Sequence, residues 1–506
     1  MLKLTVTRPY LWLPVRADAP AQWVRLFGGD ALLTEFSLCA AADPEYYACL
    51  PLRGHMGATL HLACEGDSDW LPALRQEDAP PVYDCPRPRL HFTPPFGWIN
   101  DPNGLILDRG VYHLYYQHNP YGTQWGNMHW GHAQSADLVH WEHLPLALAP
   151  DDTGTMYSGS AVKDAHGLLG ESADALLFYY TAAGGENPRS GDAPFTQRLA
   201  VSTDGGRTLR KTGDVIVPEL APGNRDPKVF YHAPTQGYVM VLYLSGNEFA
   251  ILRSDDLAHW KVTQRLTLDK AWECPDLFEL SVDGDSRNTR WVFWSADGFY
   301  WLGDFDGSRF LPETGRLCAY TGTLPYAAQT YSGTGRRVLS VAWLRTKNAG
   351  LPYTGMMSIP AELSLTHTAY GLRVAFSTPC LDALSRIPVP AQQRAEKLLF
   401  SPTGDGPYLL SLTLPAHFSG TAHITLPGAE LRADFTHGRC SLGETGFDFD
   451  PASPLDLRLV MDTGILELTA LSGTVWLPVE VPRDAGREIT VDAPGAEAAL
   501  FLLAHA

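Results

Sequence analysis

Three short segments of the sequence each place a carboxylate within two residues of a proline. They are Asn100-Asp101-Pro102-Asn103-Gly104, Arg225-Asp226-Pro227 and Trp272-Glu273-Cys274-Pro275. An acid followed by proline has a restricted backbone, and Pro-Asn-Gly favours a turn, so these carboxylates are expected to be presented rigidly. Three such acids can do glycoside chemistry: one attacks the anomeric carbon, one protonates the departing oxygen and one holds substrate hydroxyls. Taken singly, each acid could equally belong to an Asx-capped turn or a salt-bridged strand end.

The segments that must position these acids are short apolar and aromatic runs separated by Gly, Pro, Asp and Asn. Runs rich in Val, Tyr, Phe and Trp are typical of β-strands, and they occur at Val111 to Tyr116, Leu176 to Tyr180, Tyr238 to Leu244, Trp291 to Trp294, Ile465 to Leu468 and Val475 to Val481. The sequence therefore predicts an all-β protein.

A weak internal repeat marks the middle of the chain. Ser135-Ala136-Asp137-Leu138-Val139-His140-Trp141 recurs as Ser254-Asp255-Asp256-Leu257-Ala258-His259-Trp260, with a looser copy at Ser202 to Leu209. Recurrence every fifty to seventy residues is what the blades of a β-propeller would give. A common turn sequence that arose by chance is the alternative.

Proline-rich connectors suggest two domain boundaries. Asp78-Ala79-Pro80-Pro81 and Cys85-Pro86-Arg87-Pro88 precede the central region, and Ile387-Pro388-Val389-Pro390 follows it. Residues 1–84 and 385–506 are then predicted to be separate β modules, the second of them a β-sandwich.

Composition limits the classes of partner. The chain has 506 residues, with 38 Lys and Arg against 56 Asp and Glu and a net charge of −18, which disfavours nucleic acid and anionic membranes. The first residues lack the apolar run of a secretory signal, and the eight cysteines form no Cys-x-x-Cys pair. We therefore expect a cytoplasmic protein, or a secreted one if a signal was removed. The sequence does not indicate an oligomeric state.

Histidines are frequent in the first part of the central region, which raises the question of a metal. They stand at positions 91, 113, 118, 129, 132, 140 and 143 without a shared short ligand spacing such as His-Glu-x-x-His. We expect no metal and no other cofactor. Cys274 is expected to be a small buried neighbour of Glu273 rather than a reactive thiol.

Seven motifs follow one another in a fixed order. They are Trp98 to Gly104, Tyr116-Gln117-His118-Asn119-Pro120, Trp125 to His132, Tyr157-Ser158-Gly159-Ser160, Arg225-Asp226-Pro227, Glu273-Cys274-Pro275 and Tyr326-Ala327-Ala328-Gln329-Thr330. In this order they resemble glycoside hydrolase family 32, the family of invertases, inulinases and levanases. The resemblance covers residues 86 to about 365. Gly355 to Leu363 resembles the segment that closes the family's propeller, and residues 1–84 more faintly resemble an extra N-terminal module of some bacterial levanase-like members.

The resemblance implies a fold and a site. The fold is a five-bladed β-propeller over residues 86–370, followed by the C-terminal β-sandwich and preceded by the small N-terminal β module. Asp101 matches the nucleophile, Glu273 the general acid/base and Asp226 the residue that stabilises the transition state. Residues around the terminal fructosyl unit are matched by Asn100, Gln117, Trp125, Tyr157, Ser158, Arg225 and, more weakly, Trp343.

The implied activity is that of a retaining, exo-acting β-fructosidase that releases fructose from fructooligosaccharides, inulin- or levan-type fructans, or sucrose. Retention requires the carboxyl groups of Asp101 and Glu273 to lie about 5 to 5.5 Å apart. Glu273 must begin protonated, which burial or neighbouring carboxylates would favour, and Arg225 is expected to keep Asp226 ionised.

Two alternatives to hydrolysis stay open, as does the preferred linkage. A fructosyltransferase differs only in whether water or another sugar opens the intermediate, and a fructan-binding protein would have lost one of the three acids. The sequence departs from the family at Thr323-Leu324-Pro325, where members often carry an acid and Phe. The preference on the leaving-group side is therefore left undetermined, as is the choice between β-2,1 and β-2,6 linkages.

Overall fold

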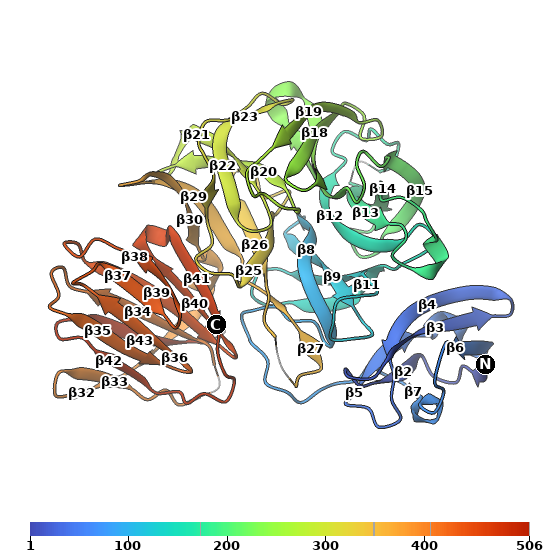
Figure 1. Cartoon of the computed structure of the whole chain (residues 1–506), viewed down its shortest axis with the longest axis horizontal. Helices are drawn as coiled ribbons and strands as arrows, with labels where there is room; N and C mark the ends of the chain where they lie inside the picture. Colours follow the sequence, from blue (N-terminus) through green and yellow to red (C-terminus); the bar gives the residue numbers. More distant parts are fainter. Residues whose placement is uncertain (173, 348–349, 405, 505–506) are drawn as a thin grey trace.

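The computed structural model describes residues 1–172, 174–347, 350–404 and 406–504. The fold is all-β, as predicted: within these residues every helix is a short 3₁₀ turn, at Arg53–His55, Leu71–Ala73, Pro188–Ser190, Ala233–Thr235, Pro379–Ala383 and Leu471–Gly473. Three parts follow one another along the chain, namely an N-terminal module, a propeller and a C-terminal sandwich (Figure 1). The module and the sandwich lie at opposite ends of the molecule, with the propeller between them.

The N-terminal module is built of two small antiparallel sheets around one apolar core. One sheet has the order β1 (Leu2–Thr5), β6 (Thr59–Cys64), β3 (Ala21–Gly28), β4 (Ala31–Cys39), and the other β5 (Tyr46–Pro51), β2 (Tyr10–Val15), β7 (Arg75–Glu77). Its core includes Leu11, Leu13, Val24, Phe36 and Leu62.

The propeller has five blades of antiparallel strands that the chain builds one after another, and a parallel pairing of Val282 with Leu365 joins the fourth blade to the fifth. The first blade consists of β8 (Gly97–Asp108), β9 (Val111–Asn119), β10 (His129–Ser135) and β11 (Glu142–Leu148). The second consists of β12 (Thr155–Lys163), β13 (Leu176–Ala183), β14 (Thr196–Ser202) and β15 (Arg210–Val217). The third consists of β16 (Arg225–His232), β17 (Gly237–Ser245), β18 (Glu248–Ser254) and β19 (Lys261–Thr267). The fourth is β20 (Asp276–Val282), β21 (Asp285–Trp294), β22 (Phe299–Phe305), β23 (Phe310–Pro312), with β24 (Leu317–Cys318) beside β22, and the fifth is β25 (Pro325–Thr330), β26 (Val338–Leu344), β28 (Met356–Met357), β29 (Ala361–Thr368), β30 (Gly371–Ser377). Since β30 ends at Ser377, the last blade extends beyond the expected limit of residue 370.

Strands inside the blades are apolar on both faces because each blade packs between two others. In β17, Tyr238, Met240 and Leu242 join one buried cluster, whereas the alternate residues Val239 and Val241 join another. A strand that alternates between two cores reads as a continuous apolar run, which is why these segments were visible in the sequence.

The repeated Ser-x-Asp-Leu segment forms the same turn in two blades. Leu138 and Leu257 both have φ 68°, and the Asp that precedes each leucine accepts hydrogen bonds from the backbone that follows. The turns join the third and fourth strands of blades one and three, and the looser copy joins those of blade two. The repeat is therefore a feature of the blades rather than a chance recurrence.

The ring is closed by β27 (Tyr353–Thr354), which pairs in parallel with the start of β8. The closing residues thus come just before the segment that the sequence indicated.

The sandwich consists of two antiparallel sheets with one apolar core between them. The first sheet has the order β31 (Ser385–Val389), β43 (Glu497–Ala504), β34 (Tyr408–Leu414), β39 (Leu455–Asp462), β40 (Ile465–Ala470), β41 (Val475–Glu480). The second has the order β32 (Ala391–Arg394), β33 (Lys397–Phe400), β42 (Ile489–Asp492), β35 (Thr421–Leu426), β36 (Ala429–Asp434), β37 (Arg439–Leu442), β38 (Thr445–Asp448).

A buried histidine joins the sandwich to the rest of the chain. The two ring nitrogens of His91 lie 3.0 Å from Asp462 Oδ2 and 3.0 Å from Glu467 Oε1. Asp462 also accepts the Leu90 N–H, and Glu467 accepts the Ile359 N–H. The two carboxylates raise the pKa of His91 to about 9, against the effect of its burial, so the buried group carries a charge at neutral pH.

Candidate active site

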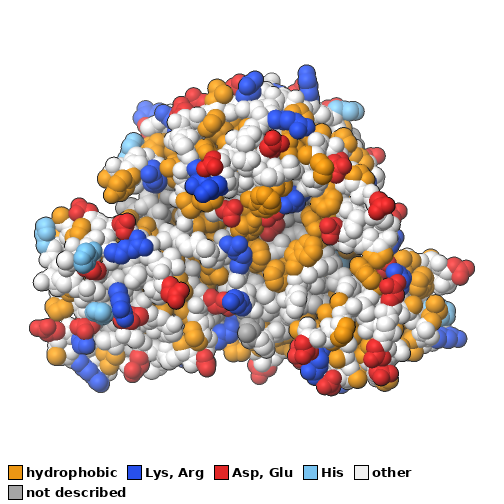
Figure 2. All heavy atoms as spheres, viewed as in Figure 1, with side chains coloured by type: hydrophobic (Ala, Val, Ile, Leu, Met, Phe, Trp, Pro, Cys, Tyr) orange, Lys and Arg blue, Asp and Glu red, His pale blue; other side chains and the backbone are white. Residues whose placement is uncertain are grey.

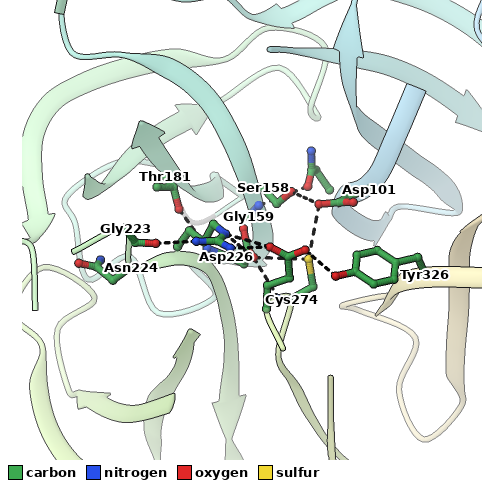
Figure 3. A network of polar contacts seen from close by, with 12 residues as sticks. Asp101, Ser158, Gly159, Thr181, Gly223, Asn224, Asp226, Cys274 and Tyr326 are labelled. Carbon is green, nitrogen blue, oxygen red and sulfur yellow. Dashed lines mark hydrogen bonds and ion pairs between the residues drawn. The ribbon is translucent and has the colours of Figure 1, made fainter. Parts of the chain in front are cut away.

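Each of the five blades supplies one polar side chain to a single cluster. Asp101, Ser158, Asp226 and Tyr326 lie at the starts of β8, β12, β16 and β25, and Glu273 lies three residues before β20. These are the first strands of their blades. The first strands of blades one, two, three and five contact one another in turn, so their starting ends meet at one place (Figure 3).

Irregular pairing turns these side chains out of the regular strand pattern. The ladder of β8 skips between Ile99 and Pro102, that of β16 between Arg225 and Lys228, and that of β12 between Tyr157 and Gly159. Proline has no N–H for the ladder, so an Asp-Pro pair favours such a bulge, and a bulge re-aims the side chain beside it.

Asp101 accepts two hydrogen bonds on one oxygen. Ser158 Oγ donates to Oδ2 at 2.7 Å and the Cys274 thiol lies 3.4 Å from the same atom (Figure 3). Burial and the nearby Glu273 charge raise the pKa of Asp101, whereas the bonds from Ser158 and Cys274 lower it. The hydroxyl and the thiol therefore favour the ionised form that a nucleophile needs.

Asp226 is the most buried of the three acids. The Cys274 N–H donates to its Oδ2 at 3.0 Å, and its own N–H donates to Thr181 Oγ1 at 3.1 Å. Burial raises the pKa of Asp226 to about 7; Arg225 opposes this rise, and the charges of Glu273 and Asp101 add to it.

Glu273 is held on both carboxylate oxygens. Arg225 donates to Oε2 from Nε at 3.0 Å and from Nη2 at 2.7 Å, and Tyr326 donates to Oε1 at 2.6 Å. Arg225 also forms an ion pair with Asp226, with its Nε 3.8 Å from Oδ2, and its charge lowers the pKa of Asp226 as expected, whereas its hydrogen bonds go to Glu273. Arg225 reaches Glu273 across the cluster because the bulge at Asp226 turns the two neighbouring side chains apart.

Strained backbone accompanies the acids. Asp226, Glu273, Cys274 and Ala327 have φ of 65°, 22°, 44° and 51°, a region that residues with a Cβ seldom adopt. Each such residue costs roughly 1–3 kcal/mol and persists where the surroundings fix it, commonly at functional sites.

The expected fructosyl-binding residues lie around the acids with different exposures. Gln117 is buried and donates to Met156 O at 2.9 Å, while Asn100 accepts from the Trp98 indole at 2.8 Å. Trp125 is 52% exposed and its ring meets that of Tyr157 at 6.0 Å.

Trp343 is half-buried, and the Tyr326 ring separates it from the acids. Its ring is 6.1 Å from that of Tyr326, which in turn contacts Glu273. Its indole N–H is buried with no hydrogen-bond partner among the described residues.

Three contacts of the acids were not anticipated as such. Tyr326 stands inside one of the quoted motifs, so its role could have been sought there, whereas Thr181 lies within the otherwise apolar strand β13 and carried no signal. Cys274 is buried as expected, but its thiol lies between two aspartates, 3.4 Å from each. Burial and these carboxylates raise its pKa, so the thiol stays protonated.

A cation lies beside Leu324, where the sequence departs from the family. The guanidinium of Arg345 lies 4.6 Å from the centre of the Tyr326 ring, and the Arg345 N–H donates to Leu324 O at 3.0 Å. An arginine over the face of a tyrosine is a favourable cation–π contact.

A buried ion pair lies between the first strands of three blades. Lys228, two residues after Asp226, lies with its Nζ 3.1 Å from Asp276 and 2.6 Å from Thr330 O. Lys228 and Asp276 are both almost fully buried. The three residues belong to β16, β20 and β25, so they fill the space between three first strands.

Charged side chains and histidines also occur outside the three acids, over the described residues. Acidic and basic side chains are interspersed over the face in Figure 2 rather than gathered in one patch. In the described part of the chain no group of three or more His, Cys, Asp and Glu side chains is arranged to hold a metal ion. Over the same residues no helix is long and apolar enough to cross a membrane.

Comparison with known proteins identifies the family. Residues 91–374 match the Glycosyl hydrolases family 32 N-terminal domain. The chain therefore belongs to glycosyl hydrolase family 32.

Relatives and solved structures agree with this membership. A levanase of Bacillus subtilis is 40% identical over 57% of this chain and 46% of its own length, and an extracellular exo-inulinase of Aspergillus niger is 33% identical over 56% and 63%. The chain thus spans about half to two thirds of the length of these relatives. The exo-inulinase of Aspergillus awamori has TM-score 0.75 and 25% identity, covering 84% of this chain and 99% of that one. A family 32 structure from Bifidobacterium adolescentis shares the fold over 100% of this chain and 99% of its own, with TM-score 0.69 and 20% identity.

Proposed function

We propose that this protein is a retaining, exo-acting β-fructosidase. The observation that carries the proposal is the convergence of Asp101, Asp226 and Glu273 at the starting ends of the first strands in a member of family 32. The similar levanase and exo-inulinase support fructosides as the substrate class.

The contacts fit a double displacement in which the acids have different roles. Asp101 attacks C2 of the fructofuranosyl unit while Glu273 gives its proton to the departing oxygen, and a covalent fructosyl-enzyme forms. Glu273 then removes a proton from water, which attacks C2 and releases fructose with retained configuration. Asp226 binds fructosyl hydroxyls as positive charge develops on the ring.

Local hydrogen bonds suit these roles. Ser158 donates to Asp101 and so favours the ionised nucleophile. Tyr326 and Arg225 fix the orientation of Glu273 from two sides, so that its proton can be directed at the leaving oxygen. During the reaction Glu273 must exchange protons within this hydrogen-bonded setting.

The test is to incubate the protein with sucrose, inulin-type and levan-type oligosaccharides and both polymers, and to follow the products over time. Fructose released singly from the first minutes supports exo-hydrolysis. A ladder of shortened oligosaccharides would contradict exo-action, and mainly longer products at high sucrose would favour the fructosyltransferase. Binding of fructan without release of reducing sugar would favour a binding protein.

We also propose a cytoplasmic location. All eight cysteines are free thiols, and Cys318 is exposed, which suits a reducing compartment. Fractionation of cells, with the protein followed by antibody, tests this. Recovery from the culture medium would favour secretion, as the name of the extracellular exo-inulinase suggests for that relative.

A further inference from the structure

One hairpin of the N-terminal module contacts two loops of the propeller. Strands β3 and β4 lie beside the first two blades (Figure 1). Three consecutive residues of β4, namely Glu35, Phe36 and Ser37, make contacts with the loop that joins β9 to β10 and with the loop that joins β13 to β14. Both loops carry or adjoin residues expected to bind sugar.

The loop between β9 and β10 is anchored in the module on two sides. Tyr121 is 3% exposed, belongs to the module's apolar core and stacks on Phe36 with ring centres 4.1 Å apart. Asn127 accepts from Ser37 N–H and donates to Ser37 O, both at 2.8 Å. The segment between these two anchors includes Trp125.

The loop between β13 and β14 is held by a buried carboxylate. Glu35, whose side chain is 3% exposed, accepts the Arg189 N–H at 3.0 Å on one oxygen and pairs with Arg25 at 3.1 Å on the other. Arg189 lies in the 3₁₀ turn of this loop, which Asn187 caps by accepting the Ser190 N–H.

Both anchored loops contact the same aromatic ring, that of Tyr157. The Tyr157 ring meets Trp125 of the first loop at 6.0 Å, and it meets Phe195, at the end of the second loop, at 5.5 Å. Tyr157 directly precedes Ser158, which donates to Asp101. Trp125 is 52% exposed and makes few contacts of its own, so its placement depends on the loop that carries it.

We propose that the β3–β4 hairpin is a positioning element for substrate binding: it fixes the two loops, and through them Trp125 and Tyr157, at the rim of the active site. The inference rests on the proposed β-fructosidase function and assigns a role to the N-terminal module in it. The hairpin contacts none of the three acids, so it acts on the affinity for the fructoside and not on the chemical step.

Two variants release the loops separately. Glu35→Ala removes the acceptor of the Arg189 N–H. Asn127→Asp removes the donor to Ser37 O and to Asn119 Oδ1 while keeping a side chain suited to its φ of 45°. Asp43→Ala is the matched control, because Asp43 also pairs with an arginine of the module but is 85% exposed and has no propeller partner among its described contacts.

We expect KM for a fructooligosaccharide to rise about 3- to 10-fold in each loop variant, with kcat within about 2-fold of the wild type, and both constants unchanged in Asp43→Ala. Amide hydrogen exchange should quicken at residues 120–128 in Asn127→Asp and at 184–194 in Glu35→Ala. Such results would mean that the two loops are more mobile while the proposed catalytic acids keep their arrangement.

Each other outcome is decisive. Unchanged KM in both variants, with faster exchange in the loops, overturns the positioning role. A parallel loss of kcat and melting temperature in both would assign the hairpin to overall stability instead. Absence of fructoside hydrolysis by the wild type overturns the proposed function itself, whereas an active wild type with unaffected variants overturns this inference alone.

Discussion

Arg225 directs two hydrogen bonds, of 2.7 and 3.0 Å, to a single oxygen of Glu273 and stays 3.8 Å from Asp226. One cation therefore serves two of the proposed catalytic acids in different ways. It fixes the orientation of Glu273 by contact and lowers the pKa of Asp226 through its charge.

Replacing Arg225 should affect both the rate and its pH dependence. In Arg225→Ala we expect kcat/KM to fall about 10²- to 10³-fold, because an oriented charged contact is lost. The pKa of Asp226, about 7 with Arg225 present, should rise without it, so the gain of activity with increasing pH should move to higher pH. A pH profile of kcat/KM for both proteins measures the shift; an unmoved profile would contradict a role for ionised Asp226.

Removal of either proposed reacting carboxylate should abolish turnover in distinguishable ways. Asp101→Asn should lose several orders of magnitude in rate on every fructoside. Glu273→Ala should keep its first step only with an activated leaving group, and added azide should then yield a fructosyl azide of retained configuration. Asp137→Asn, in an outer turn of the first blade, is the control and should remain fully active. A fully active Asp101→Asn would end the proposed mechanism.

Tyr326→Phe tests how much the orientation of Glu273 contributes to the rate, because the carboxyl group itself is kept. The lost hydrogen bond to Glu273 is 2.6 Å long, and a bond to a charged group contributes about 1.5–3 kcal/mol, which corresponds to roughly a 10- to 150-fold loss in kcat. KM should change little, because the hydroxyl faces Glu273. Steady-state kinetics on sucrose and on an oligosaccharide give both constants, and a loss confined to KM would place Tyr326 in substrate binding instead.

The buried His91 should make stability sensitive to alkaline pH. Its pKa in the folded protein, about 9, lies above the ordinary value near 6.5, so its stabilisation is complete below pH 6.5 and is lost as the pH rises through 9. His91→Gln should lower the free energy of unfolding by roughly 3–5 kcal/mol at neutral pH, since two buried carboxylates lose their cation.

Thermal melts of the wild type and His91→Gln from pH 6 to pH 10 provide the comparison. The melting temperature of the wild type should fall over the upper part of this range, and the difference between the two proteins should narrow there. His140→Gln is a control, because that histidine is exposed on an outer turn. A constant difference across the range would contradict the charge assigned to His91.

Much of this arrangement is visible in the sequence because local chemistry determines it. Asp101-Pro102 and Asp226-Pro227 predict rigid acids, and the missing proline N–H is what creates the bulge that turns each acid toward the centre. The all-β fold and the blade repeat follow from strand patterns and from the Ser-x-Asp-Leu turn.

Contacts between distant segments were not predictable in the same way. The pairing of Arg225 with Glu273 depends on side-chain directions across two blades, so sequence proximity indicated Asp226 but not this second partner. Thr181 and the contacts of Glu35 likewise involve partners 45 and 154 residues away, with no local pattern to mark them.

The parallel pairing of Tyr353 with Gly97 affects how the protein folds during its synthesis on the ribosome. Until Ser332 and then β27 emerge, β8 is paired on one side by β9 and presents its other edge unpaired. At translation speeds of about 5–20 residues per second, that edge waits roughly 10–50 s for its partner. An open strand edge is a template for unwanted association. The strand that bears the proposed nucleophile is therefore vulnerable during synthesis, and a defect in β27 would first reduce the yield of correctly folded chains.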